Sequence, residues 1–136
     1  MATPDEELSV WPPTLDFFAP FASMQRRTIL LKNMSKTHEV LFKVRCTNPD
    51  RYRLVRGQGR VSAGGRAAVE VLLRPFTFDP STFYDDKFCV STLYPPDDRP
   101  LGPMMTISDC FALGDMAVDH KIPVRFVNES NQIIKN

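Results

Sequence analysis

The chain has 136 residues, enough for one ordinary globular domain and too few for two. Its formal net charge of +1, from 17 Lys and Arg against 16 Asp and Glu, excludes a uniformly basic nucleic-acid binder. A hydrophobic fraction of 43% with only 24% charged residues excludes an intrinsically disordered chain. The 12 prolines interrupt helices but are tolerated in turns and at strand edges, which favours an all-β fold.

Apolar and polar residues alternate with a period of two in several segments, as expected of half-buried strands. In chain order, the sequence predicts strands over residues 14–19, 25–33, 39–47, 67–74, 86–94 and 121–127. Turn-forming Pro, Gly, Asn and Asp residues separate these segments. About seven short strands at this spacing predict one all-β domain, a seven-stranded immunoglobulin-like β-sandwich.

The alternation also predicts which side chains face the core. In residues 39–47 the inward set is Val40, Phe42, Val44 and Cys46, and the outward set is Leu41, Lys43, Arg45 and Thr47. In residues 86–94 the inward set is Phe88, Val90, Thr92 and Tyr94, and the outward set is Lys87, Cys89, Ser91 and Leu93. Leu72 is expected to point outward as well. Residues 94–119 are rich in Pro and Gly and predict a long loop, with one helical turn near 108–113.

Positive charge is concentrated in the middle of the chain. Between Lys43 and Arg74 there are eight basic and two acidic residues, a local net charge of +6. Lys43 and Arg45 share the outward face of one predicted strand. Lys87 and Cys89 share the outward face of another. If these strands are sheet neighbours, they form a basic strip that fits an acidic peptide with an aromatic anchor, although a merely solvated sheet face has the same pattern.

The residue types that usually carry catalysis form no recognisable constellation. His38 and His120 lack metal-ligand spacing. The adjacent aspartates Asp85 and Asp86 have the character of solvated loop residues. We therefore expect that the chain is not an enzyme and holds neither a metal nor a cofactor.

Cysteine usage and the lack of a recognisable targeting signal predict a cytoplasmic chain. Cys46, Cys89 and Cys110 are odd in number and lack metal spacing, so a disulfide framework is not expected. The N-terminus has no signal-peptide pattern, and no run approaches the roughly 18 apolar residues of a membrane span. Without a signal peptide, the glycosylation-like triplets that begin at Asn33 and Asn128 are expected to be chance matches.

Three stretches carry a family resemblance: residues 42–52 read FKVRCTNPDRY, residues 73–80 read LRPFTFDP, and residues 86–90 read DKFCV. They resemble the major sperm protein (MSP) domain, especially that of the VAMP-associated proteins. The resemblance implies the seven-stranded immunoglobulin-like sandwich. It places an MSP domain at 8–128 and flexible tails at 1–7 and 129–136.

VAMP-associated proteins bind short acidic motifs called FFAT, two phenylalanines in an acidic tract, and recruit the proteins that carry them to the endoplasmic reticulum. The resemblance therefore implies a non-enzymatic adaptor in the cytoplasm or at the cytosolic face of that membrane and its contact sites. It implies partners with FFAT-like motifs, and neither nucleic acid nor direct membrane insertion. The alternative is a self-assembling structural protein like the sperm cytoskeletal branch, and homodimerisation stays open.

Matching position by position, the resemblance implies a peptide-binding site made of Lys43, Arg45, Cys46, Thr47, Lys87, Cys89 and Lys121. In that site Thr47 would hydrogen-bond the peptide backbone, and the cations would attract its acidic flank. Two positions of this site depart from the family pattern. Cys46 replaces a threonine, and Cys89 replaces a common methionine, which makes the pocket wall smaller. The lost apolar contact would cost on the order of 1 kcal/mol of peptide binding.

Overall fold

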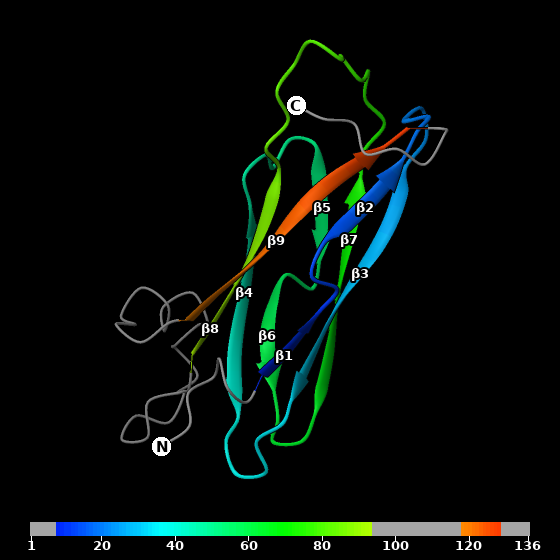
Figure 1. Ribbon diagram of the computed structural model, residues 1–136. Coiled ribbons are helices and arrows are strands. Elements are labelled where there is room, and N and C mark those ends of the chain that lie inside the picture. Colours follow the sequence, from blue (N-terminus) through cyan, green and yellow to red (C-terminus); the bar gives the residue numbers. More distant parts are fainter. Residues whose placement is uncertain (1–7, 94–117, 129–136) are drawn as a thin grey trace.

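The computed structural model describes residues 8–93 and 118–128, which form strands joined by turns and loops (Figure 1). In this part of the chain the strands are β1 (Leu8–Trp11), β2 (Leu15–Phe18), β3 (Gln25–Asn33), β4 (Val40–Cys46), β5 (Tyr52–Val55), β6 (Gln58–Val61), β7 (Arg66–Leu73), β8 (Lys87–Leu93) and β9 (Val118–Val127). These residues contain no helix, so the predicted all-β class is confirmed.

The strands form two sheets that face each other as a sandwich. One sheet has the order β1-β3-β7-β5 and the other has the order β2-β9-β8-β4-β6. Neighbouring strands pair antiparallel except for β2 and β9, which run parallel. In Figure 1, β4, β8 and β9 form one layer, while β1 and β3 belong to the other. The predicted immunoglobulin-like sandwich is therefore confirmed.

The described residues form nine strands rather than about seven, because short strands escape the alternation. β1, β5 and β6 have four residues each, too few for a period of two to stand out. Pro12 and Pro13 follow β1, and the chain then changes sheets before β2. At the other end, β9 begins at Val118, three residues earlier than its predicted start. The rest of the predicted 94–119 loop, the helical turn in it and the two tails lie outside the described residues.

The core lies between the sheets and is rich in aromatic side chains. Phe17 and Phe88 are fully buried, and the ring of Tyr52 meets that of Phe88 edge-on with 4.9 Å between centroids. At one end of the sandwich a second aromatic group closes the core, formed by Phe21, Phe76, Phe78, Tyr84 and Phe126. This packing accounts for much of the unusually high phenylalanine content of the chain.

The predicted inward side chains of β4 and β8 within the described residues are buried or half-buried. Four outward side chains of β4, β7 and β8 are buried as well, which alternation did not predict. Leu41, Leu72, Ser91 and Leu93 have at most 6% of their surface exposed. The alternation fixes only the direction of a side chain and not what covers it. Leu41 and Leu93 are paired across β4 and β8, and Ser91 lies against the Arg45 guanidinium. Leu72 lies between Arg26 and Arg53, whose long stems can shield it.

Asn33 is fully buried at the end of β3, where it organises the turn into β4. Its side-chain Nδ2 donates to the backbone oxygens of His38, Val61 and Ser62 at 2.8 to 3.2 Å. A glycan cannot be attached to an amide in this position without unfolding the turn. The burial gives a physical reason for treating the Asn33 triplet as a chance match.

Candidate functional site

The basic strip depends on β4 and β8 being neighbours, and they are. β4 pairs with β8 and β8 with β9, so three strands contribute side chains to one outer surface. The register places Arg45, Cys89 and Lys121 in one row across β4, β8 and β9. Because paired residues in adjacent strands lie about 5 Å apart, the row places one cation on each side of the Cys89 thiol.

An open hollow of about 330 Å³ lies where β4 ends and β8 begins. It is lined by Arg45, Cys46, Thr47, Lys87, Cys89 and Lys121, six of the seven residues assigned from the family resemblance. Lys43 does not line the hollow. It lies two residues before Arg45 on the same face of β4 and pairs with Ser91 of β8. This hollow is called the basic hollow below, and Lys43 lies beside it.

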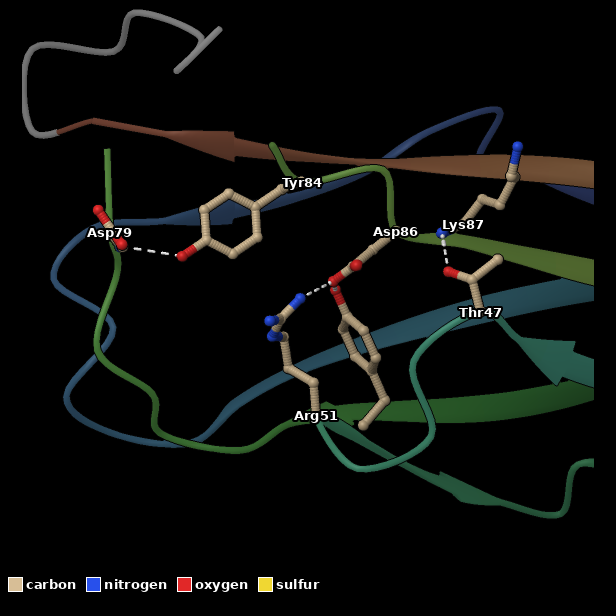
Figure 2. Close-up of polar contacts among 7 residues, drawn as sticks. Thr47, Arg51, Asp79, Tyr84, Asp86 and Lys87 are labelled. Atoms are coloured by element: carbon tan, nitrogen blue, oxygen red, sulfur yellow. Dashed lines mark hydrogen bonds and ion pairs between the residues drawn. The ribbon is translucent and has the colours of Figure 1, made fainter. Parts of the chain in front are cut away.

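Thr47 and Lys87 hold one wall of the basic hollow together. The Thr47 backbone N–H donates to the Lys87 carbonyl at 3.1 Å, and the Lys87 backbone N–H donates to Thr47 Oγ1 at 3.1 Å. Figure 2 shows the second of these contacts joining the end of β4 to the start of β8. A hydroxyl accepts and donates at the same time, so this contact leaves the Thr47 proton for an acceptor outside.

The cations of the basic hollow are only weakly engaged with protein carboxylates. Lys87 Nζ lies 3.8 Å from the exposed Asp85, a contact of little energetic value. Arg45 donates to Ser91 Oγ at 3.1 Å, and Ser91 donates on to Asp119 at 2.7 Å. Lys121 has no carboxylate within 4 Å in the described part of the chain. The surface therefore keeps a positive potential.

Two free thiols line the basic hollow from different sides. Cys46 follows Val44 inward, packs against the core and is half-buried. Burial raises the pKa of the Cys46 thiol, which keeps it neutral. Cys89 points outward, with its sulfur 3.8 Å from Ser91 Oγ. Both thiols act as small apolar wall groups next to the cations.

Behind the basic hollow lies a buried polar cluster that the sequence did not predict. Asp86, expected to be solvated, is only 8% exposed and accepts hydrogen bonds from Arg51 and from the Tyr52 hydroxyl, the latter at 2.6 Å. Figure 2 shows the Arg51 side chain reaching Asp86. The guanidinium lies 4.9 Å from the Phe76 ring centroid and 5.0 Å from that of Tyr84.

The sequence did contain a signal for the burial of Asp86, namely its position in the alternating pattern. It precedes Phe88 by two residues and Val90 by four, so alternation alone places it on the inward side. Its neighbour Asp85 points outward, with 68% of its side chain exposed. Because Lys87 is the next residue, the anchored Asp86 fixes where the wall of the basic hollow begins.

Two other features of the described residues bear on the kind of site. Residues 8–93 and 118–128 hold no group of three or more His, Cys, Asp or Glu side chains arranged to bind a metal ion. In the same residues, no helix has the length and apolar character needed to cross a membrane. The chemistry that the geometry does provide is a concave surface with cations, thiols and one hydroxyl.

Comparisons with known proteins show which family the chain belongs to. The family model for the MSP (major sperm protein) domain matches residues 7–105. Vesicle-associated membrane protein-associated protein A of Homo sapiens is 36% identical over 97 residues, which is 71% of this chain and 39% of that protein. The chain thus spans well under half the length of this relative.

Solved structures show the same fold at low sequence identity. WR4, an MSP family member of C. elegans, superposes with a TM-score of 0.66 at 19% identity and covers 87% of this chain and 95% of that one. The periplasmic chaperone SfaE superposes with a TM-score of 0.63 at 7% identity, over 90% of this chain and 58% of its own. At these identities the likeness concerns the sandwich alone.

Proposed function

Because the chain belongs to the MSP (major sperm protein) domain family, we propose that it is a non-enzymatic adaptor domain that binds short acidic peptides of the FFAT type in the basic hollow. One observation carries the proposal. The fold gathers Arg45, Thr47, Lys87 and Lys121, from three strands, around two small apolar thiols. That combination suits an aromatic side chain flanked by carboxylates.

Each part of the basic hollow has a role in this function. The thiols of Cys46 and Cys89 and the hydrocarbon stems of the lysines supply apolar contact for an aromatic ring. The charged ends of Arg45, Lys87 and Lys121 attract the acidic residues beside that ring and speed the encounter. The free hydroxyl proton of Thr47 suits a backbone carbonyl of an extended peptide.

The proposed partners are proteins with FFAT-like motifs, and the proposed location is the cytoplasm or the cytosolic face of the endoplasmic reticulum. The name of the human relative records association with a vesicle-associated membrane protein, which supports a role in protein recruitment. The proposal needs no enzymatic activity, because an open surface of cations and thiols is sufficient for capture.

A titration with a labelled FFAT peptide tests the proposal. We expect binding that weakens as salt is raised, because the attraction acts between partly exposed charges. The double variant Lys87→Asp with Cys89→Asp should abolish binding, since it places two carboxylates in the basic hollow. The matched control is Arg53→Asp, which reverses an exposed cation on the other sheet and should bind as the parent does.

Absence of binding at low salt, or equal loss in the control, would refute the proposal. Light scattering over a range of protein concentrations then distinguishes the alternative. Growth of large particles in a chain that does not bind the peptide would favour a self-assembling structural protein.

A further inference from the structure

The outer face of the β1-β3-β7-β5 sheet carries an exposed apolar row. Trp11 of β1 is paired with Leu30 of β3, and Leu30 is paired with Ala68 of β7. Trp11 is 61% exposed and Leu30 is 50% exposed, so both side chains project from the sheet into solvent. Two large apolar side chains next to each other on one face form a patch, which isolated exposed residues do not.

Cations lie one row away from this apolar row on one side and two rows away on the other. Lys32 and Arg66 are paired with each other one row away, and neither has a carboxylate within 4 Å in the part of the chain that the structure describes. On the other side the adjacent row holds Thr28 and Glu70. Arg26 and Arg53 lie in the row beyond it, with Leu72 between them. The strands of this face contribute these four outward cations and one outward carboxylate, that of Glu70, which lies 3.9 Å from Arg26.

We propose that this face docks on an anionic phospholipid membrane, with Trp11 and Leu30 at the boundary between headgroups and acyl chains and with Lys32 and Arg66 on the headgroup phosphates. Tryptophan favours that boundary because its ring is apolar while its indole N–H stays wet. Lys and Arg beside it keep their charge among the headgroups while their stems follow the apolar layer.

The shape of the patch favours a membrane over an acidic peptide. A peptide anchor needs a recess, as in the basic hollow, whereas Trp11 and Leu30 themselves protrude. Protruding apolar side chains flanked by cations match a soft surface that they can enter. The docking is peripheral, because only side chains of one sheet face reach the lipid.

The two surfaces of the sandwich can be occupied together. The two sheets are separate layers of the sandwich (Figure 1). The four-stranded sheet carries the apolar row, and the outer side of the five-stranded sheet carries the basic hollow. A domain resting on lipid through the first surface would present the second away from the membrane. The membrane proposal stands whether or not the basic hollow binds a peptide.

The chain carries its own reporter, because Trp11 is its only tryptophan. The full chain is mixed with vesicles of phosphatidylcholine alone or with about 30% phosphatidylserine, at low and at physiological salt. We expect a blue shift of the emission and protection from iodide quenching with the anionic vesicles only, strongest at low salt. The full chain is used so that the negative charges of Asp5, Glu6 and Glu7, which precede β1 in the sequence, are included in the measurement.

Variants identify the face. Lys32→Gln with Arg66→Gln should lower vesicle partitioning about 25-fold, since each cation near an anionic surface contributes about fivefold. Leu30→Ser keeps the reporter and should lower partitioning about fivefold. The matched control, Lys43→Gln with Lys121→Gln, removes the same charge from the other sheet and should stay within about twofold of the parent.

Three results would overturn the proposal. One is a Trp11 emission unchanged by anionic vesicles at low salt. Another is an equal loss of partitioning in the control and in the Lys32 and Arg66 variant. The third is a blue shift with an acidic polyglutamate peptide and none with vesicles, which would assign the face to an acidic protein. A peptide titration that succeeds or fails at the basic hollow leaves each of these outcomes unchanged.

Discussion

Arg45 and Arg51 are six residues apart in the same basic stretch, yet the fold uses them in opposite ways. Arg51 has 19% of its side chain exposed, pairs with Asp86 and lies against the rings of Phe76 and Tyr84. Arg45 is exposed on β4, and within the described residues its guanidinium donates to Ser91. The first cation belongs to the folded core, and the second remains available to a ligand.

The difference between the two arginines shows why a count of charges does not locate a binding site. A buried cation must keep its carboxylate partner, because a desolvated charge without one is very costly. An exposed cation without such a partner adds little to stability and leaves its field for a ligand. Of the positive residues between 43 and 74, only Arg45 lines the basic hollow, and Lys43 lies beside it. The other two cations of the hollow, Lys87 and Lys121, come from elsewhere in the sequence.

The largest expected effect concerns the buried member of this comparison. Asp86→Ala leaves the Arg51 guanidinium, which is largely shielded from solvent, without its carboxylate and the Tyr52 hydroxyl without its acceptor. We expect the free energy of unfolding to fall by about 3 to 5 kcal/mol, measured by urea denaturation. The matched control is Asp85→Ala, whose exposed side chain should change it by less than about 0.5 kcal/mol. Equal losses in the two variants would show that Asp86 is not a structural partner.

A smaller effect isolates the hydroxyl of the same cluster. Burial, and after it the hydrogen bond to Asp86, raises the pKa of Tyr52, so its hydroxyl stays protonated and donates. Tyr52→Phe keeps the ring that packs on Phe88 and removes only this donor. We expect a loss of about 1.5 to 3 kcal/mol in the free energy of unfolding, because the acceptor is a carboxylate. An unchanged denaturation midpoint would contradict the assignment.

The role of the exposed cations, of which Arg45 is one, is tested with two lysines of the same surface. Lys121 lines the basic hollow, while Lys43 lies beside it on β4. In a peptide titration, Lys121→Gln should raise the dissociation constant about three- to fivefold, and Lys43→Gln less than about twofold. Both variants remove one charge, so the difference measures position alone. A larger effect from Lys43 would move the peptide along β4, away from the basic hollow.

Sequence reasoning reached the fold and most of the candidate site for identifiable reasons. Alternation put Lys43 with Arg45 and Lys87 with Cys89 on outward faces, and the pairing of β4 with β8 then joined them. Lys121 followed only from the family resemblance, because nothing local says which strand pairs with β8.

The errors have an equally physical origin. Asp86 was expected to be solvated because a pair of aspartates in a turn-rich segment resembles solvent-exposed sequence. Its position two residues before Phe88 nevertheless places it on the inward face. The burial of four outward side chains was also missed, because what covers an outer face depends on neighbouring strands. They are Leu41, Leu72, Ser91 and Leu93. Cross-strand partners are long-range contacts, and one sequence does not contain them.

The smallest expected effect concerns an ion pair that is more exposed than the Arg51–Asp86 pair, although its arginine, unlike Arg45, does have a carboxylate partner. Asp16 of β2 is in register with Arg125 of β9, and the Arg125 guanidinium donates to both Asp16 oxygens at 2.7 Å. These hydrogen bonds hold the pKa of the Asp16 carboxyl below its usual value. Since Arg125 is 41% exposed, solvent screens the pair, and we expect it to contribute about 0.5 to 1 kcal/mol.

The pH dependence of this contribution follows from the direction of the shift. Because the folded Asp16 has the lower pKa, its contribution is complete above the unfolded value of about 4 and is lost as the pH falls through the folded pKa. Asp16→Asn should therefore be less stable than the parent at neutral pH and approach it in acid, as followed by urea denaturation at several pH values. A difference that stays constant from neutral pH into strong acid would mean that Asp16 acts through packing, because a lost charge pair must disappear when the parent carboxylate is protonated.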